Sequence, residues 1–183
     1  MAATSAIAIA SLITGCNGAP SGEPHARPST SSAISIATSA SSTDSGAAAD
    51  AVSAYRHFIE ATDVMATSGG RDTSELRKYA SGAMLGAELN QAATFKAQKW
   101  HSVGKQKVVW TKVLKIAPQN SGRADEITVQ ACVDSSQAIA LTTDGKKVRP
   151  PGTPTQLLDE MKMVRARDEW RANFPQSRRA GRC

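Results

Sequence analysis

A long stretch with almost no large apolar side chains limits where this chain can fold. Between Asn17 and Asp50, Ser, Ala, Thr, Pro and Gly dominate, and Ile34 and Ile36 are the only large aliphatic residues. Such a segment cannot bury enough apolar surface to offset its conformational entropy, so we expect a flexible tether over residues 16–50. The remaining residues, 51–183, have the length of a single folded domain.

A short apolar segment precedes the tether and ends at Cys16. The run from Ala6 to Ile13 is too short for a membrane span of about 20 residues, but it suits the apolar part of a secretory signal, about 7 to 15 residues. With Gly15 directly before Cys16, the pattern resembles a bacterial lipoprotein signal. The resemblance implies that residues 1–15 are a signal peptide and that Cys16 carries a lipid whose acyl chains include palmitate. It places the protein at the cell membrane, on the extracytoplasmic face.

Two observations keep an alternative to this signal open. Residues 1–5 contain neither Lys nor Arg, although export signals normally begin with a positive charge. A disordered Ala/Ser tail with a chance cysteine is therefore the competing interpretation.

Two further cysteines, Cys132 and Cys183, remain if Cys16 carries lipid. An even number of cysteines in an oxidising compartment favours a disulfide. Cys132 lies in a strand-like run, and Cys183 ends a polar C-terminal segment that would otherwise fray, so the bond would hold that segment to a sheet. Two free thiols in a cytosolic protein are the alternative. A catalytic thiol is less favoured than either, because no His is placed to activate it.

The first half of the expected domain has the periodicity of helices. Apolar residues at three- and four-residue steps predict a helix over residues 51–68, ended by Gly69-Gly70; they are Val52, Tyr55, Phe58, Ile59, Thr62 and Met65. Asp72 or Thr73 can cap a second helix, and a third helical run covers residues 84–99.

The second half has the periodicity of strands. The expected strands cover residues 103–116, 127–134, 138–142, the end of 157–164, and a closing strand on which Trp170, Ala172 and Phe174 share a face. Asp144-Gly145 is a hairpin turn signal. Helices followed by a meander of strands predict an α+β fold.

Three of these features resemble the NTF2-like (SnoaL-like) superfamily, in particular its secreted or lipid-anchored actinobacterial members. They are the opening helix 51–68, the strand 129–134 before a hairpin, and the closing strand that begins at Trp170. The resemblance implies N-terminal helices packed in a curved antiparallel sheet, which forms a cone with an apolar pocket. The candidate pocket residues are Tyr55, Phe58, Trp110, Asp134 and Trp170.

Enzymes of that superfamily place a His or Asp acid/base pair in the cone. His57 beside Glu60 and Asp63 is a candidate for such a pair, but a solvated helix face accounts for it better. His101 lies near the first strand, and turn capping explains Asp134 equally well. We therefore name no catalytic residue.

The sequence has no His/Cys pair at metal-ligand spacing and no Walker or Rossmann glycine pattern. We therefore expect no metal site and no cofactor.

The net charge of +6 is concentrated in two regions. Lys105, Lys107, Lys112 and Lys115 share one strand region, and six arginines follow nearer the C-terminus: Arg165, Arg167, Arg171, Arg178, Arg179 and Arg182. For an exported, tethered domain this charge favours anionic lipid headgroups and acidic envelope polymers over nucleic acid. A basic sheet face that only aids solubility is an equal alternative.

These observations favour a tethered, non-enzymatic binding or scaffold module that docks onto an envelope protein, because no acid/base pair is visible. A small-molecule carrier or enzyme that uses the cone pocket is the alternative. A narrower form of the first interpretation is a lipoprotein that blocks an envelope step such as phage DNA entry. The oligomeric state is left open.

Overall fold

The computed structural model describes residues 42–118, 124–181 and 183. The expected signal peptide, Cys16 and most of the expected tether lie outside these residues. Three helices are followed by six strands: α1 (Ser42–Thr67), α2 (Ser74–Tyr79), α3 (Gly82–Gln98), β1 (His101–Val103), β2 (Lys107–Pro118), β3 (Ala124–Asp134), β4 (Ile139–Leu141), β5 (Gln156–Ala166) and β6 (Glu169–Ala180). No helix within the described ranges is long and apolar enough to cross a membrane.

Helix α1 begins at Ser42, upstream of the expected start at Ala51. Ala47, Ala48 and Ala49 have the highest helix propensity of any residue type, and Ala47 and Ala51 are buried in the core, so packing and propensity both extend the helix. The helix ends as expected at Gly69 and Gly70, which have φ of 67° and 76°. Gly70 is required there because a Cβ atom would lie 2.0 Å from the carbonyl oxygen of Ala92 on α3.

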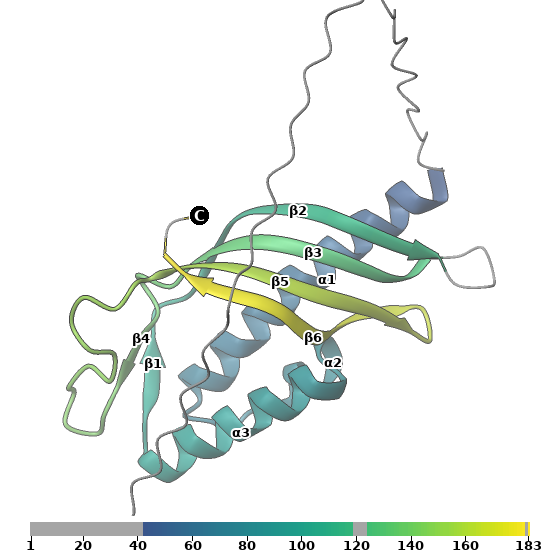
Figure 1. Ribbon diagram of the computed structural model, residues 1–183. Helices are drawn as coiled ribbons and strands as arrows, with labels where there is room; N and C mark the ends of the chain where they lie inside the picture. The colour runs from purple at the N-terminus through teal and green to yellow at the C-terminus, as the bar shows by residue number, and fades with distance from the viewer. Residues whose placement is uncertain (1–41, 119–123, 182) are drawn as a thin grey trace, which may run out of the picture. The chain divides into compact units, whose positions relative to one another are not determined.

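The strands form two antiparallel sheets. Strands β2, β3, β5 and β6 pair in that order in a four-stranded sheet, while β1 pairs only with β4 in a separate two-stranded sheet (Figure 1). Consecutive strands β5 and β6 are joined by a tight hairpin in which Arg167 and Asp168 both have positive φ, 52° and 70°. This is the geometry of a two-residue turn that matches the twist of the strands.

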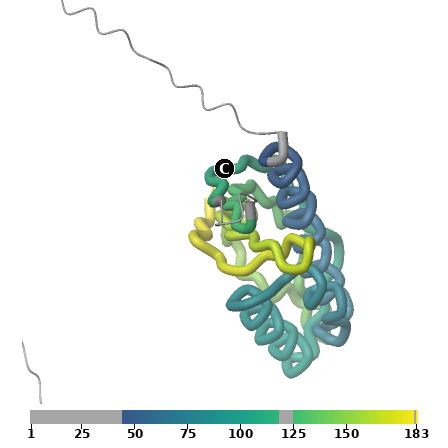
Figure 2. The backbone as a smooth tube through the Cα atoms, turned by 90° about the vertical axis from the view of Figure 1, so that its right-hand side faces the viewer, coloured from purple at the N-terminus to yellow at the C-terminus, as the bar shows by residue number. Residues whose placement is uncertain are grey.

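The helices lie against one face of the four-stranded sheet, and the two layers are visible side by side in Figure 2. Alternate residues of β3 and β5 point at the helices and are buried: Ile127, Val129, Ala131, Val133, Met161 and Met163. From α1, Tyr55, Phe58 and Met65 complete this core and are at most 1% exposed. We call the sheet face that points at the helices the inner face, and the opposite one the outer face.

The expected fold class, an α+β cone of NTF2-like type with N-terminal helices packed in a curved antiparallel sheet, is wrong. The described residues are 36% helical and 39% strand, and the helices cover one face of an open sheet instead of lying inside a cone. A cone needs strands that continue around the helices, but β1 and β4 pair only with each other. The periodicity of each strand reports that one side is buried, and it carries no information on sheet closure.

A second correction concerns the closing strand. Trp170 and Ala172 are buried as expected, but Phe174 is 50% exposed. The pairing of β5 with β6 shifts by one residue between Met163–Ala172 and Lys162–Phe174. This irregularity turns Phe174 to the outer face, because a shift of one residue exchanges the two faces of a strand.

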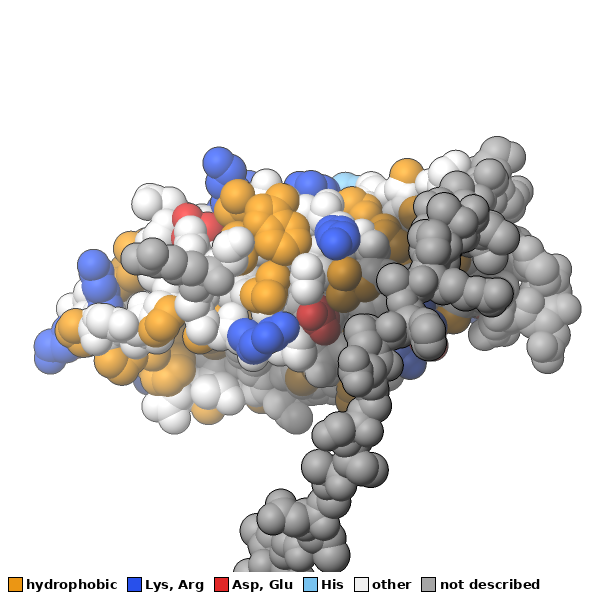
Figure 3. Space-filling view, turned by 45° about the horizontal axis from the view of Figure 1, so that its top comes forward, with side chains coloured by type: hydrophobic (Ala, Val, Ile, Leu, Met, Phe, Trp, Pro, Cys, Tyr) orange, Lys and Arg blue, Asp and Glu red, His pale blue; other side chains and the backbone are white. Residues whose placement is uncertain are grey.

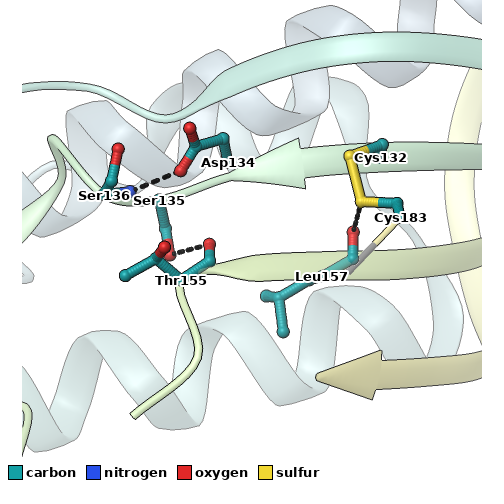
Figure 4. The surroundings of a disulfide bond; sticks show 7 residues. All are labelled: Cys132, Asp134, Ser135, Ser136, Thr155, Leu157 and Cys183. Atoms are coloured by element: carbon teal, nitrogen blue, oxygen red, sulfur yellow. Dashed lines mark hydrogen bonds between the residues drawn. A yellow bond between two sulfur atoms is a disulfide. The ribbon is translucent and has the colours of Figure 1, made fainter. Parts of the chain in front are cut away.

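The chain end is held to the sheet by a disulfide between Cys132 of β3 and Cys183, whose sulfur atoms are 2.04 Å apart (Figure 4). Cys132 is buried, and it lies on the outer face between its register partners Trp110 of β2 and Leu158 of β5. The bond therefore crosses from the middle of the sheet to Cys183, three positions beyond the end of β6.

Candidate functional site

The five residues expected to line a cone pocket do not lie together. Tyr55, Phe58 and Trp170 belong to the core on the inner face, and the ring centroids of Tyr55 and Phe58 are 6.4 Å apart. Trp110 and Asp134 are half-buried on the outer face. The Asp134 carboxylate accepts a hydrogen bond of 2.8 Å from the backbone N–H of Ser136 (Figure 4). Asp134 therefore caps the turn, which was the alternative to a functional role.

A buried polar cluster lies at the centre of the inner face. The Tyr55 hydroxyl donates a hydrogen bond of 2.8 Å to Asp159 on β5, whose side chain is only 1% exposed. From β6, Nε of Arg178 donates to the other carboxylate oxygen of Asp159 at 3.2 Å. Buried polar groups are stable only when such partners satisfy them, so these three side chains form one structural unit.

The cluster shifts the pKa of each donor in a direction that keeps it protonated. Burial, followed by the Asp159 carboxylate, raises the pKa of Tyr55. For Arg178, burial opposes the charged form, but the carboxylates of Asp159 and Glu88 outweigh it and raise its pKa. The cluster is therefore a phenol and a cation held around one carboxylate, with no free proton acceptor of its own.

Glu88 of α3 faces this cluster and is 5% exposed. Burial raises the pKa of its carboxyl, the Arg178 guanidinium lowers it, and Asp159 raises it. Glu88 and Arg178 together line a small hollow of about 90 Å³, to which Gln91 and Gln106 also contribute.

This hollow adjoins a larger opening, which we call the polar cleft. The cleft has a volume of about 380 Å³ and shares Gln91, Gln106 and Arg178 with the hollow. Its other polar walls are Asp63 of α1 and Arg149, and its apolar walls include Phe95, Trp100, Val148 and Leu157. The cleft is thus built by α1, α3, the two-stranded sheet and the ends of β5 and β6.

Asp63 and Gln106 fix one side of the polar cleft. The Asp63 carboxylate accepts hydrogen bonds from the backbone N–H of Gln106 at 3.0 Å and from its side-chain amide at 3.2 Å. The same amide donates to the Thr62 hydroxyl at 2.9 Å. Burial raises the pKa of Asp63, although the Gln106 hydrogen bonds work in the opposite direction. Gln106 therefore ties the loop before β2 to α1.

Arg149 brings a cation to the opposite side of the cleft. It is half-buried, and its guanidinium donates to the Ser135 carbonyl oxygen at 3.2 Å and to the Ser135 hydroxyl at 3.0 Å. Within the described part of the chain it has no carboxylate partner. The cleft thus offers a positioned guanidinium that is free to pair with an anionic group.

Neither His57 nor His101 lines the polar cleft. Nδ1 of His57 is 3.0 Å from a carboxylate oxygen of Glu60 on the exposed side of α1, and its ring stacks on Tyr79 at 5.1 Å. His101 is exposed on β1. Across the described ranges, no group of three or more His, Cys, Asp or Glu is arranged to hold a metal ion.

Sequence reasoning missed Asp159, Glu88 and Arg149 and placed Arg178 in a general basic region. One signal was available in the sequence. Asp159 lies on the same side of its strand as the buried Met161 and Met163, and a carboxylate at such a position needs a partner. The partner, Tyr55, is 104 residues away in the sequence, so no local pattern could have identified it.

Comparisons with known proteins do not place the chain in a family. No family model and no curated protein matches it. Two solved structures are similar at low identity. The intermembrane space region of the chloroplast protein ARC6 has a TM-score of 0.47 and 12% identity over 72% of this chain and 98% of its own. A de novo designed β-sheet protein has a TM-score of 0.36 and 16% identity over 73% and 92%. Neither likeness carries an argument about function, and no match tests membership of the NTF2-like superfamily.

Proposed function

We propose that this protein is a lipid-anchored protein on the extracytoplasmic face of the cell membrane, and that its folded unit is a tethered, non-enzymatic binding module. The ligand site is the polar cleft. The observation that carries the proposal is the Arg149 guanidinium, held in position by Ser135 and without a carboxylate partner among the described residues.

The polar cleft favours binding over catalysis, because the carboxylate that lines it already has hydrogen-bond partners. Among the described carboxylates, Asp63 lines the cleft and accepts hydrogen bonds from Gln106, whereas Glu88 lines only the adjoining hollow, beside Arg178. A general base must instead be free to take a proton from a substrate within hydrogen-bond reach. A cleft with one available guanidinium, two amides and an apolar wall is suited to hold an anionic group next to an apolar one.

The anchor rests on the sequence around Cys16 and on the composition of the segment that follows it. A flexible tether over residues 17–41, which precede α1, would have a mean reach of about 25 to 30 Å, from roughly 5 to 6 Å times the square root of its length. This length clears the lipid headgroups and leaves the cleft accessible to an envelope partner.

Native mass spectrometry of the protein extracted from its own envelope tests both parts. We expect a chain that begins at Cys16, carries a diacylglycerol, and has a bound companion. A protein companion would identify a docking module, whereas a small molecule would identify a carrier, for which a cleft of about 380 Å³ is large enough.

Two variants connect the companion to the cleft. Arg149→Gln removes the available cation and should release the companion, while Arg77→Gln, on the exposed side of α2, should retain it. An unlipidated wild-type mass would overturn the anchor. A companion that is retained by Arg149→Gln would overturn the cleft as its site.

A further inference from the structure

None of the described helices covers the outer face of the four-stranded sheet, and the β2 edge of this face has an unusual composition. Cross-strand neighbours share a face, so Trp110, Lys112 and Lys115, which are paired with Cys132, Gln130 and Thr128, lie on the outer face. In a view from above the sheet, hydrophobic side chains lie beside Lys and Arg side chains (Figure 3).

Two bulges increase the apolar content of this edge. The pairing of β2 with β3 shifts between Val108 and Trp110 and again between Val113 and Lys115. The extra residues are Val109 and Leu114, which are 49% and 43% exposed. Because a bulge sets two residues opposite one, each extra residue is added beside its outward-facing neighbour. We call Val109, Trp110, Lys112, Leu114 and Lys115 the β2 patch.

The cations of the β2 patch are not compensated. Two acidic side chains of the outer face are paired with cations of β5 and β6: Glu126 pairs with Lys162 at 3.1 Å, and Glu160 lies 3.8 Å from Arg179. In the part of the chain that the structure describes, Lys112 and Lys115 have no carboxylate within ion-pair distance. The patch therefore combines exposed apolar groups with free positive charge.

Protection of a sheet edge explains only part of this composition. Lysines and bulges on an edge strand prevent pairing with other chains, and β2 is an edge strand. That role needs charge and irregular backbone, whereas exposed Val and Leu at the bulges work against it. Trp, aliphatic side chains and Lys on one surface are instead the combination found where proteins meet the lipid headgroup region.

We propose that the β2 patch binds an anionic lipid surface directly, independently of Cys16. Lys112 and Lys115 face the phosphate groups, and Val109, Trp110 and Leu114 lie among the headgroups and the first acyl carbons. Charge complementarity selects this occupant, since each Lys near an anionic leaflet contributes about 1 kcal/mol.

The test uses the full chain with Cys16→Ser, which cannot be lipidated, and co-sedimentation with phosphatidylglycerol or phosphatidylcholine vesicles. We expect binding to phosphatidylglycerol only, weakened by salt. Lys112→Gln with Lys115→Gln should weaken it roughly thirtyfold, from about 1 kcal/mol per Lys. Lys96→Gln with Lys147→Gln, at two exposed positions on α3 and after β4, is the matched control and should bind like the parent.

A second variant separates the apolar contribution from the charge. Leu114→Ser changes a side chain that is 43% exposed, so it should leave the fold intact and weaken vesicle binding severalfold without changing its salt dependence. Equal binding to both lipids, or equal losses in the patch and control variants, would overturn the proposal. So would a concentration-dependent dimer that Leu114→Ser abolishes in the absence of vesicle binding, because the patch would then be an interface between two copies.

Discussion

At the scale of single residues, Asp159 links the two layers of the fold. Its carboxylate receives a hydroxyl from α1 and a guanidinium from β6, and it is almost completely buried. Glu88 brings a second acidic group close to the same guanidinium. The inner face therefore contains a charged cluster within an otherwise apolar core.

We expect Asp159→Asn to lower the free energy of unfolding by about 2 to 3 kcal/mol, because Arg178 near the core loses the carboxylate to which it is hydrogen-bonded. The value is below that of a fully buried pair because the Arg178 side chain is 43% exposed. Tyr55→Phe removes one hydrogen bond and should cost about 1 to 2 kcal/mol. Urea unfolding with an unchanged slope measures both, and a smaller loss for Asp159→Asn than for Tyr55→Phe would contradict the role of the charge.

Glu88→Gln should change how stability depends on pH. Burial raises the pKa of Glu88 in the folded state, so the folded protein holds this proton at pH values where the unfolded chain has released it. Stability is therefore lost as the pH rises from about 4.3, the unfolded value, through the folded pKa. Gln cannot ionise, so the stability of Glu88→Gln relative to the parent should increase between pH 4 and pH 7. Urea titrations at several pH values give the difference in unfolding free energy between the variant and the parent. A difference that stays constant or decreases with pH would show that burial does not raise the pKa of Glu88.

At the scale of secondary-structure elements, the tight turn at Arg167-Asp168-Glu169 was predictable from the sequence, whereas the lengths of β5 and β6 were not. The expected closing strand was recognised from Trp170 and Ala172, but it continues to Ala180. The C-terminal half of β6 carries polar and basic residues with little apolar alternation. This half is ordered because it pairs with β5. The position of Phe174 depends on a pairing irregularity, which no single strand encodes.

Cys183→Ser should destabilise the protein by about 4 kcal/mol in the chain-entropy model, because the disulfide closes a loop with a sequence separation of 51. The end of β6 should also fray, since the bond holds the last residue to β3. Urea unfolding of the oxidised parent against the variant measures the loss, and the reduced parent should unfold like the variant. Free alkylation of Cys132 in the oxidised parent would show that the bond is not formed in solution.

At the scale of the whole molecule, the arrangement separates two candidate binding surfaces. The polar cleft opens among α1, α3 and the two-stranded sheet, whereas the β2 patch lies on the outer face of the other sheet. A protein held by lipid and by the β2 patch could therefore bind a ligand in the cleft at the same time.

Cys16→Ser should shift the protein from firm to salt-sensitive association with membranes. Loss of the lipid removes the anchor, and the remaining attraction through the β2 patch is electrostatic and screened by salt. Membrane fractionation at low and high salt measures this. The parent should stay in the membrane fraction at both, and release of the parent by salt alone would mean that Cys16 carries no lipid.

The sequence by itself determined the local features of this protein. Apolar residues at three- and four-residue steps located the helices, two-residue alternation located most of the strands, and Gly69-Gly70 located the end of α1. With Cys16 assigned to a lipid, the cysteine count left Cys132 and Cys183 as a pair. Each of these depends on neighbouring residues or on composition. The tertiary structure alone decided that the sheet stays open, that Asp159 meets Tyr55 and Arg178, that Arg149 borders a cleft, and that Val109 and Leu114 face outward at bulges. These features depend on which distant segments pair and in which register, because periodicity reports that a face is buried but not what buries it.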